Sequence, residues 1–169
     1  MSNNSLNEEL LQLFLNYLEF EKKSSKHTVI SYKNDISQFL NCIGEVTIPE
    51  VTSKDVRYWI SELSKEGIAP KSINRKITAI RSFFYYLQQQ NRLSQNVARK
   101  VHSLKTKKRL PNFVEEEKMN ILLDQNFFSE GFVGLRDKTI IELLYTTGNR
   151  RAELLGLTLK SIDFSDGSM

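Results

Sequence analysis

Apolar residues recur at helical spacing in four stretches of the first ninety residues. In each stretch they stand three or four positions apart, so that they line one face of an α-helix. The four stripes are Leu10, Leu13, Phe14, Tyr17 and Leu18; Val29, Tyr32, Ile36, Phe39 and Ile43; Val56, Ile60 and Leu63; and Ile73, Ile77, Ile80, Phe84 and Leu87. This pattern predicts a small all-α domain whose four helices pack through these stripes.

Polar residues and prolines indicate where these helices begin and end. Ser25 is placed as the N-cap of the second helix, and Thr52 with Asp55 has the spacing of a capping pair for the third. Proline is unfavourable inside a helix because it lacks the backbone N–H. The three prolines all lie outside the predicted helices: Pro49, Pro70 and Pro111.

After residue 90 the regular apolar stripe ends and a second region begins. Residues 91–112 contain at most a short helical turn near Asn96–Val101, followed by the basic sequence KTKKRLP. Three consecutive glutamates then favour a helix start, because acidic side chains stabilise the positive end of the helix dipole. A further helix is predicted from about Leu135 to Tyr145. Gly148 ends it, and a short amphipathic helix, RRAELLGL, is predicted to follow. The predicted organisation is a first domain over 1–104, a linker over 105–112 and a second domain over 113–169.

The basic side chains are concentrated in the middle of the chain. Residues 67–114 hold eleven basic side chains and no acidic one, whereas the segments before and after hold more acidic than basic side chains. The net charge of +4 at pH 7 therefore conceals a strongly cationic centre. Such a centre attracts a polyanion, and nucleic acid is the usual one. The alternative is a solvated helix and a linker whose charges only keep the chain soluble.

The fourth predicted helix has two chemically different faces. Its apolar stripe is expected to pack into the domain. The opposite face and its flank carry cations and small polar groups: Lys71, Asn74, Arg75, Thr78, Arg81 and Ser82. Such a face suits a helix laid in a DNA groove, where arginine and lysine meet phosphates or base edges. A merely solvated face usually mixes both charge signs, and this face holds no acid to pair with.

Composition argues against several other functional classes. A single cysteine, Cys42, excludes an internal disulfide, and His27 and His102 stand too far apart to suggest a metal site. No stretch approaches the roughly 20 apolar residues of a membrane span, and the N-terminus is too polar for a signal peptide. We therefore expect a cytoplasmic protein that needs no metal or cofactor and whose partner is double-stranded DNA rather than a membrane.

Four segments carry a family resemblance: SKHTVISYKNDISQF at 25–39, KSINRKITAIRSFFYYL at 71–87, NVARKV at 96–101 and RDKTIIELLYTTGNRRAELLGLTLKSIDF at 136–164. With these segments the chain resembles the tyrosine recombinases, also called phage integrases, and most closely their Xer-like bacterial members. The resemblance implies a SAM-like four-helix core-binding domain, followed by the helical start of a mixed α/β catalytic domain. Further DNA-binding candidates lie on the second helix and in the linker: Lys26, Thr28, Lys105, Lys107, Lys108 and Arg109.

Within the last segment, TGNRRAEL matches the motif that bears the family's first catalytic arginine, and the match assigns that role to Arg150. A guanidinium is planar and permanently charged, so it can hold two phosphodiester oxygens as negative charge builds up in the transition state. Within the motif, Gly148 allows a tight turn at a helix start, and Glu153 resembles the family's supporting acidic residue. Without the motif, Arg150 and Glu153 would be interpreted as an ordinary i,i+3 surface pair. Arg151 has the same chemistry, but its position does not match.

The other catalytic residues that the resemblance implies lie further along the chain in this family. They are a lysine, a histidine–arginine motif, a further histidine or tryptophan and a nucleophilic tyrosine; none of the six tyrosines here matches the nucleophile's place. We therefore expect the N-terminal part of a recombinase that breaks and rejoins DNA through a covalent 3′-phosphotyrosine. The complete protein is expected to act as a tetramer on DNA, and the 169 residues alone to be inactive. Two alternatives stay open: a non-enzymatic DNA-binding relative, and a helical module that binds an acidic protein.

Overall fold

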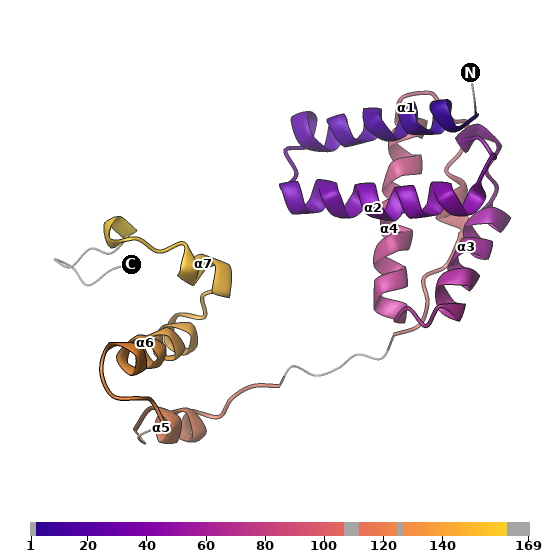
Figure 1. Ribbon diagram of the computed structural model, residues 1–169. Helices are drawn as coiled ribbons and strands as arrows, with labels where there is room; N and C mark the ends of the chain where they lie inside the picture. The colour runs from indigo at the N-terminus through magenta and orange to yellow at the C-terminus, as the bar shows by residue number, and fades with distance from the viewer. Residues whose placement is uncertain (1–2, 107–111, 125–126, 162–169) are drawn as a thin grey trace. The chain divides into compact units, whose positions relative to one another are not determined.

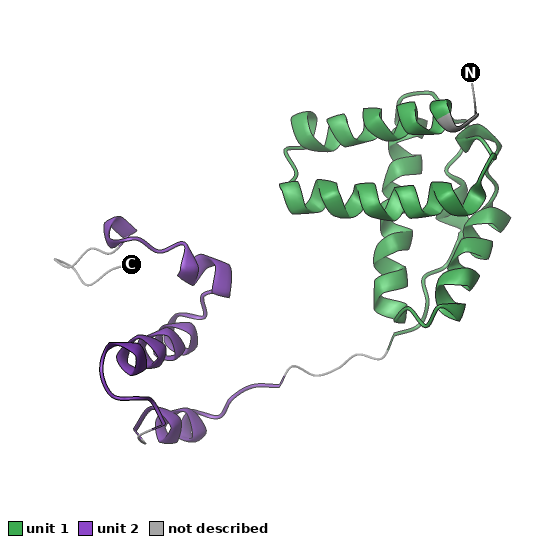
Figure 2. Ribbon diagram, in the orientation of Figure 1, with its two compact units in different colours: residues 1–108 green, residues 109–169 purple. Residues whose placement is uncertain are grey.

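The computed structural model describes residues 3–106, 112–124 and 127–161. The chain divides into two compact units, residues 1–108 and 109–169, which we call the first and the second unit (Figure 2). The described residues form helices and connecting segments without a β-strand, which confirms the predicted all-α class. Neither a helix able to cross a membrane nor a cluster of three or more potential metal ligands occurs within this described part of the chain.

Four α-helices build the first unit, as the apolar stripes predict. They are α1 (Asn3–Asn16), α2 (Lys26–Ile43), α3 (Ser53–Lys65) and α4 (Pro70–Gln89). Single turns accompany them: a π-helical turn at Tyr17–Glu21 and 3₁₀ turns at Ile48–Glu50 and Val97–Lys100. The last of these confirms the short turn predicted after the fourth helix. Helices α1 and α2 lie side by side, and α4 crosses them and also contacts α3 (Figure 1).

The helix starts follow the predicted caps. The Ser25 hydroxyl accepts a hydrogen bond from the backbone N–H of Thr28 at 3.2 Å and so caps α2. At the start of α3, the Asp55 carboxylate accepts from the Thr52 N–H at 2.8 Å and from the Thr52 hydroxyl at 2.7 Å. Pro70 is the first residue of α4, where a missing N–H leaves no helical hydrogen bond unmade.

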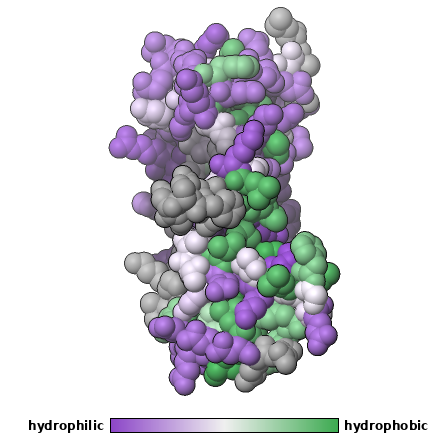
Figure 3. Space-filling view, turned by 90° about the vertical axis from the view of Figure 1, so that its left-hand side faces the viewer, coloured by the Kyte–Doolittle hydropathy of each residue, from purple (hydrophilic) through white to green (hydrophobic). Residues whose placement is uncertain are grey.

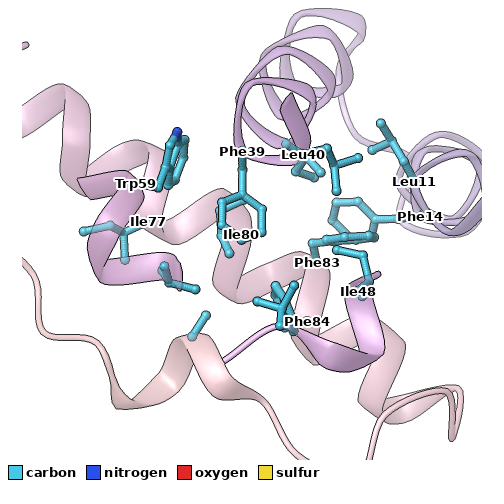
Figure 4. Packing of buried hydrophobic residues seen from close by; sticks show 14 of the residues in the cluster. Leu11, Phe14, Phe39, Leu40, Ile48, Trp59, Ile77, Ile80, Phe83 and Phe84 are labelled. Carbon is cyan, nitrogen blue, oxygen red and sulfur yellow. The ribbon is translucent and has the colours of Figure 1, made fainter. Parts of the chain in front are cut away.

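The core of the first unit lies where the four stripes meet (Figure 4). The predicted stripe of α4 is buried along its whole length: Ile73, Ile77, Ile80, Phe84 and Leu87. Trp59 of α3 and Phe83 of α4 are also buried, although neither stands in a predicted stripe. Because α4 contacts each of the other three helices, its buried face is wider than one stripe. This packing fixes the direction in which the opposite face of α4 points.

The second unit contains α5 (Glu116–Asp124), α6 (Phe132–Thr147), α7 (Arg151–Leu155) and a 3₁₀ turn at Leu159–Ser161. Helix α6 includes the predicted helix and extends beyond it at both ends. It ends at Gly148, whose φ of 67° lies in the left-handed region that favours glycine. Helices α6 and α7 contact each other across this turn.

Much of the apolar surface of the second unit is uncovered. Phe132 is 79% exposed, Leu155 72% and Leu159 81%. Among the described hydrophobic side chains of this unit, Met119 and Leu154 are the buried ones. Hydrophobic residues accordingly come to the surface in the lower part of Figure 3.

Candidate nucleic-acid interface

The face of α4 that points away from the core presents positive charge to solvent. Lys71 and Thr78 are exposed, and the Arg75 side chain is 53% exposed. The stripe on the other side of the helix is buried, so both of the predicted faces are formed. A helix anchored in this way can lie against a polyanion without disturbing its own packing.

A buried carboxylate from α2 lies against this face. The Asp35 side chain is 2% exposed and accepts hydrogen bonds from both terminal nitrogens of Arg75, with Nη2 to Oδ1 at 2.9 Å. Its Oδ1 also accepts from Lys76 Nζ at 3.0 Å. The expectation that this face has no acid to pair with is therefore wrong, because packing of α2 on α4 brings the acid from another helix. The available signal was an acid beside Ile36, at the edge of the α2 stripe, together with basic residues beside Ile77.

The segment after α4 runs back along it and occupies two of the predicted DNA-binding side chains. The Asn74 carboxamide donates to the Leu104 carbonyl at 2.9 Å and accepts from the Leu104 N–H at 2.7 Å. The Arg81 guanidinium donates to the carbonyl oxygens of Ala98, at 3.4 Å, and Val101. Asn74 and Arg81 thus hold this segment on the helix, and their role in DNA binding stays a prediction.

The remaining candidates of the first unit differ in exposure. Lys26, at the start of α2, and Lys105, at the end of the segment that runs back along α4, are exposed. Thr28 and Ser82 are half-buried. The Thr78 hydroxyl donates at 3.0 Å to a backbone carbonyl one turn earlier in its own helix. The other linker cations lie outside the described residues: Lys107, Lys108 and Arg109.

In the second unit, Arg150 is the N-cap residue of α7, and Glu153 is the third residue of that helix. The Glu153 carboxylate accepts from the Arg150 backbone N–H at 2.7 Å and from the Arg150 guanidinium at 2.9 Å. The backbone bond, and next the guanidinium bond, lower the pKa of Glu153. The Arg150 side chain is 84% exposed. The contact is thus an i,i+3 surface pair, and it also holds one edge of an otherwise accessible guanidinium.

Comparison with known proteins decides the family. Residues 11–91 match the family described as phage integrase, N-terminal SAM-like domain. The tyrosine recombinase XerC of Oceanobacillus iheyensis is 35% identical over 162 residues, which cover 94% of this chain and 53% of the relative. The chain belongs to the tyrosine recombinase family. XerD of Chlorobaculum tepidum is 38% identical over 162 residues, which cover 93% of this recombinase chain and 53% of XerD. The chain spans about half the length of these curated relatives.

Solved structures share the fold of this tyrosine recombinase chain. The Tn1549 transposon integrase, in complex with a circular intermediate DNA, aligns with a TM-score of 0.70 at 20% identity, covering 92% of this chain and 50% of the integrase. A lambda integrase dimer bound to a COC′ core site aligns with a TM-score of 0.68 at 14% identity, covering 92% and 43% of the two chains. At these identities the likeness concerns the fold.

Proposed function

We propose that the first unit binds duplex DNA through the exposed face of α4, as the N-terminal part of a site-specific tyrosine recombinase. The observation that carries the proposal is the cationic face of α4, with Lys71 and Arg75 exposed, within a phage integrase SAM-like domain. Phosphates attract such a face irrespective of sequence, and arginine adds directional hydrogen bonds to phosphates or base edges. That both integrases aligned above were solved with DNA supports the same use of the shared fold.

For the complete protein we propose strand breakage and rejoining through a covalent 3′-phosphotyrosine, by a tetramer assembled on DNA. Splitting the transfer into two transesterifications conserves the bond energy in the protein–DNA link. Arg150 is proposed to hold the reacting phosphate, with Glu153 bracing it from the α7 cap. A guanidinium has no usable lone pair and cannot itself attack phosphorus. We propose that the nucleophile is a tyrosine in a part of the complete protein outside these 169 residues.

A salt titration of binding to a labelled short duplex tests the DNA-binding proposal. If six phosphates are contacted, the logarithm of the binding constant should fall with the logarithm of salt concentration at a slope of about −5. No binding at low salt, or a slope near zero, would contradict it. Competition by polyglutamate of equal total charge tests the alternative that the partner is an acidic protein. If that alternative holds, polyglutamate should displace the DNA readily, because it mimics an acidic protein.

Two neutralised variants make this measurement specific to α4. Lys71→Gln removes an exposed cation from the proposed interface, and we expect the salt slope to become shallower by about 1. Lys54→Gln removes an exposed cation from α3 and serves as the matched control. Equal losses in the two variants would indicate a general charge effect rather than an interface on α4.

A further inference from the structure

Three side chains form an ion cluster that runs from the interior to the surface between α2 and α4. The Asp35 side chain is 2% exposed, that of Lys76 14% and that of Arg75 53%. The Lys76 ammonium contacts Asp35 at 3.0 Å and Gln38 Oε1 at 2.7 Å. The buried carboxylate therefore already has a largely buried cation as its partner. The cluster holds two cations and one carboxylate, and its excess positive charge lies on the exposed Arg75.

The same contacts hold the Arg75 guanidinium in one orientation. Its two terminal nitrogens donate to Asp35, one to each carboxylate oxygen, and such a two-point contact fixes the guanidinium plane. The contact uses two of the five N–H donors of arginine, which leaves three for a ligand. Lys71 and Thr78 are exposed about one turn before and after Arg75. The oriented guanidinium thus stands in the middle of the cationic face.

We propose that Asp35 is a positioning residue for recognition of DNA sequence by Arg75, an inference that rests on the proposed DNA binding. A long side chain loses conformational entropy when a contact immobilises it, and a guanidinium that is already held loses less. Contact with a base edge depends on direction, whereas attraction to phosphates depends mainly on charge. Asp35 therefore improves discrimination between sequences while it lowers the general attraction for DNA.

Removal of the carboxylate separates this role from simple neutralisation. If Asp35 only cancels positive charge, Asp35→Asn strengthens binding to every DNA sequence. If Asp35 positions Arg75, the same substitution weakens discrimination, while binding to a non-preferred sequence is unchanged or stronger. The two accounts predict different changes in one measured ratio of affinities.

The experiment uses two duplexes of equal length and composition. One is enriched from a randomised library by the unmodified chain, and the other is a scrambled version of it. We expect Asp35→Asn to lower the ratio of the two affinities about tenfold, and Arg75→Ala to lower it to the same extent. The double variant should lose no more than Arg75→Ala alone, because Asp35 acts through Arg75. Glu62→Gln removes a partly exposed acid from α3 and, as the charge control, should leave the ratio unchanged.

Asp35→Asn also removes the charge with which Lys76 forms an ion pair. Circular dichroism and the melting temperature therefore establish that the variant is folded. Arg75→Lys is a second variant that retains the positive charge but cannot make the two-point contact, and it should lower the ratio as well. An unchanged ratio in either folded variant overturns the proposal. So does an unmodified chain that binds DNA but enriches no sequence. An unmodified chain that binds neither duplex contradicts the proposed function itself.

Discussion

An Asn74→Ala substitution should release the end of the segment that docks on α4 just before the linker. The carboxamide makes two hydrogen bonds to the backbone of Leu104, at 2.9 Å to its carbonyl and at 2.7 Å from its N–H. Each such bond contributes roughly 1 kcal/mol to stability. Both residues are half-buried, so the freed backbone of Leu104 can bind water. The expected loss is therefore about 1–2 kcal/mol, below the penalty for fully buried unpaired groups.

Two measurements report this loss, one global and one local. Urea denaturation gives the free energy of unfolding, and the rate of tryptic cleavage after Lys105 reports local release. Arg81 still holds Ala98 and Val101 in the variant, so the release is confined to the end of the segment. We expect cleavage about tenfold faster, which corresponds to about 1.4 kcal/mol of local opening. Thr78→Ala is the matched control on the same face and should change stability by less than about 0.5 kcal/mol.

The outcome also decides between two roles of this asparagine. Unchanged unfolding free energy together with unchanged cleavage would show that the carboxamide does not hold the segment. If that stable variant bound DNA more weakly, Asn74 would be a DNA contact, as the sequence alone predicts. A loss of stability with unchanged DNA affinity would assign Asn74 to the fold.

Two further predictions concern the cap of α3 and the arginine of the second unit. Hydrogen bonds from the Thr52 hydroxyl, and next from its backbone N–H, lower the pKa of Asp55 below the ordinary value of 3.8. The ionised Asp55 carboxylate therefore stabilises the fold above pH 3.8, and this stabilisation is lost as the pH falls through the folded-state pKa. Asp55→Asn should therefore lower the free energy of unfolding by about 0.5–1 kcal/mol at neutral pH and leave it unchanged well below that pKa. If urea denaturation showed the same difference between variant and unmodified chain at every pH, this prediction would be refuted. In a chain extended to the length of its relatives, Arg150→Ala should leave DNA binding nearly intact but slow covalent adduct formation on a nicked duplex by roughly 10² or more, with Arg151→Ala much milder. An active Arg150→Ala enzyme, or an adduct from the 169-residue chain, would contradict the assignment.

The helices were predictable because their signals lie close together in the sequence. The stripe of α4 and the caps at Ser25 and Thr52 each depend on residues within a few turns, and all three are present. The extent of α6 was less predictable. It begins at Phe132, three residues before the predicted start, because hydrogen bonds rather than apolar periodicity determine the first turn of a helix.

The partners of the cationic face were not predictable in the same way, because tertiary packing supplies them. Asp35 lies 40 positions from Arg75 in the sequence, and Leu104 lies 30 positions from Asn74. A helical wheel gives the direction of a side chain but not what covers it. Charge counted along one segment therefore overstates the number of cations that are free to meet a ligand.

The eleven basic side chains of residues 67–114 consequently contribute to DNA binding in two different ways. Hydrogen bonds from Arg81 to carbonyl oxygens occupy donors but cancel no charge, whereas Asp35 cancels one unit of charge. The long-range field that draws DNA toward the first unit depends on total charge and is only slightly reduced. Close contacts depend on donors that remain open, and these are fewer. The association rate should thus reflect the whole segment, whereas the salt slope should reflect the smaller set of cations that contact phosphates.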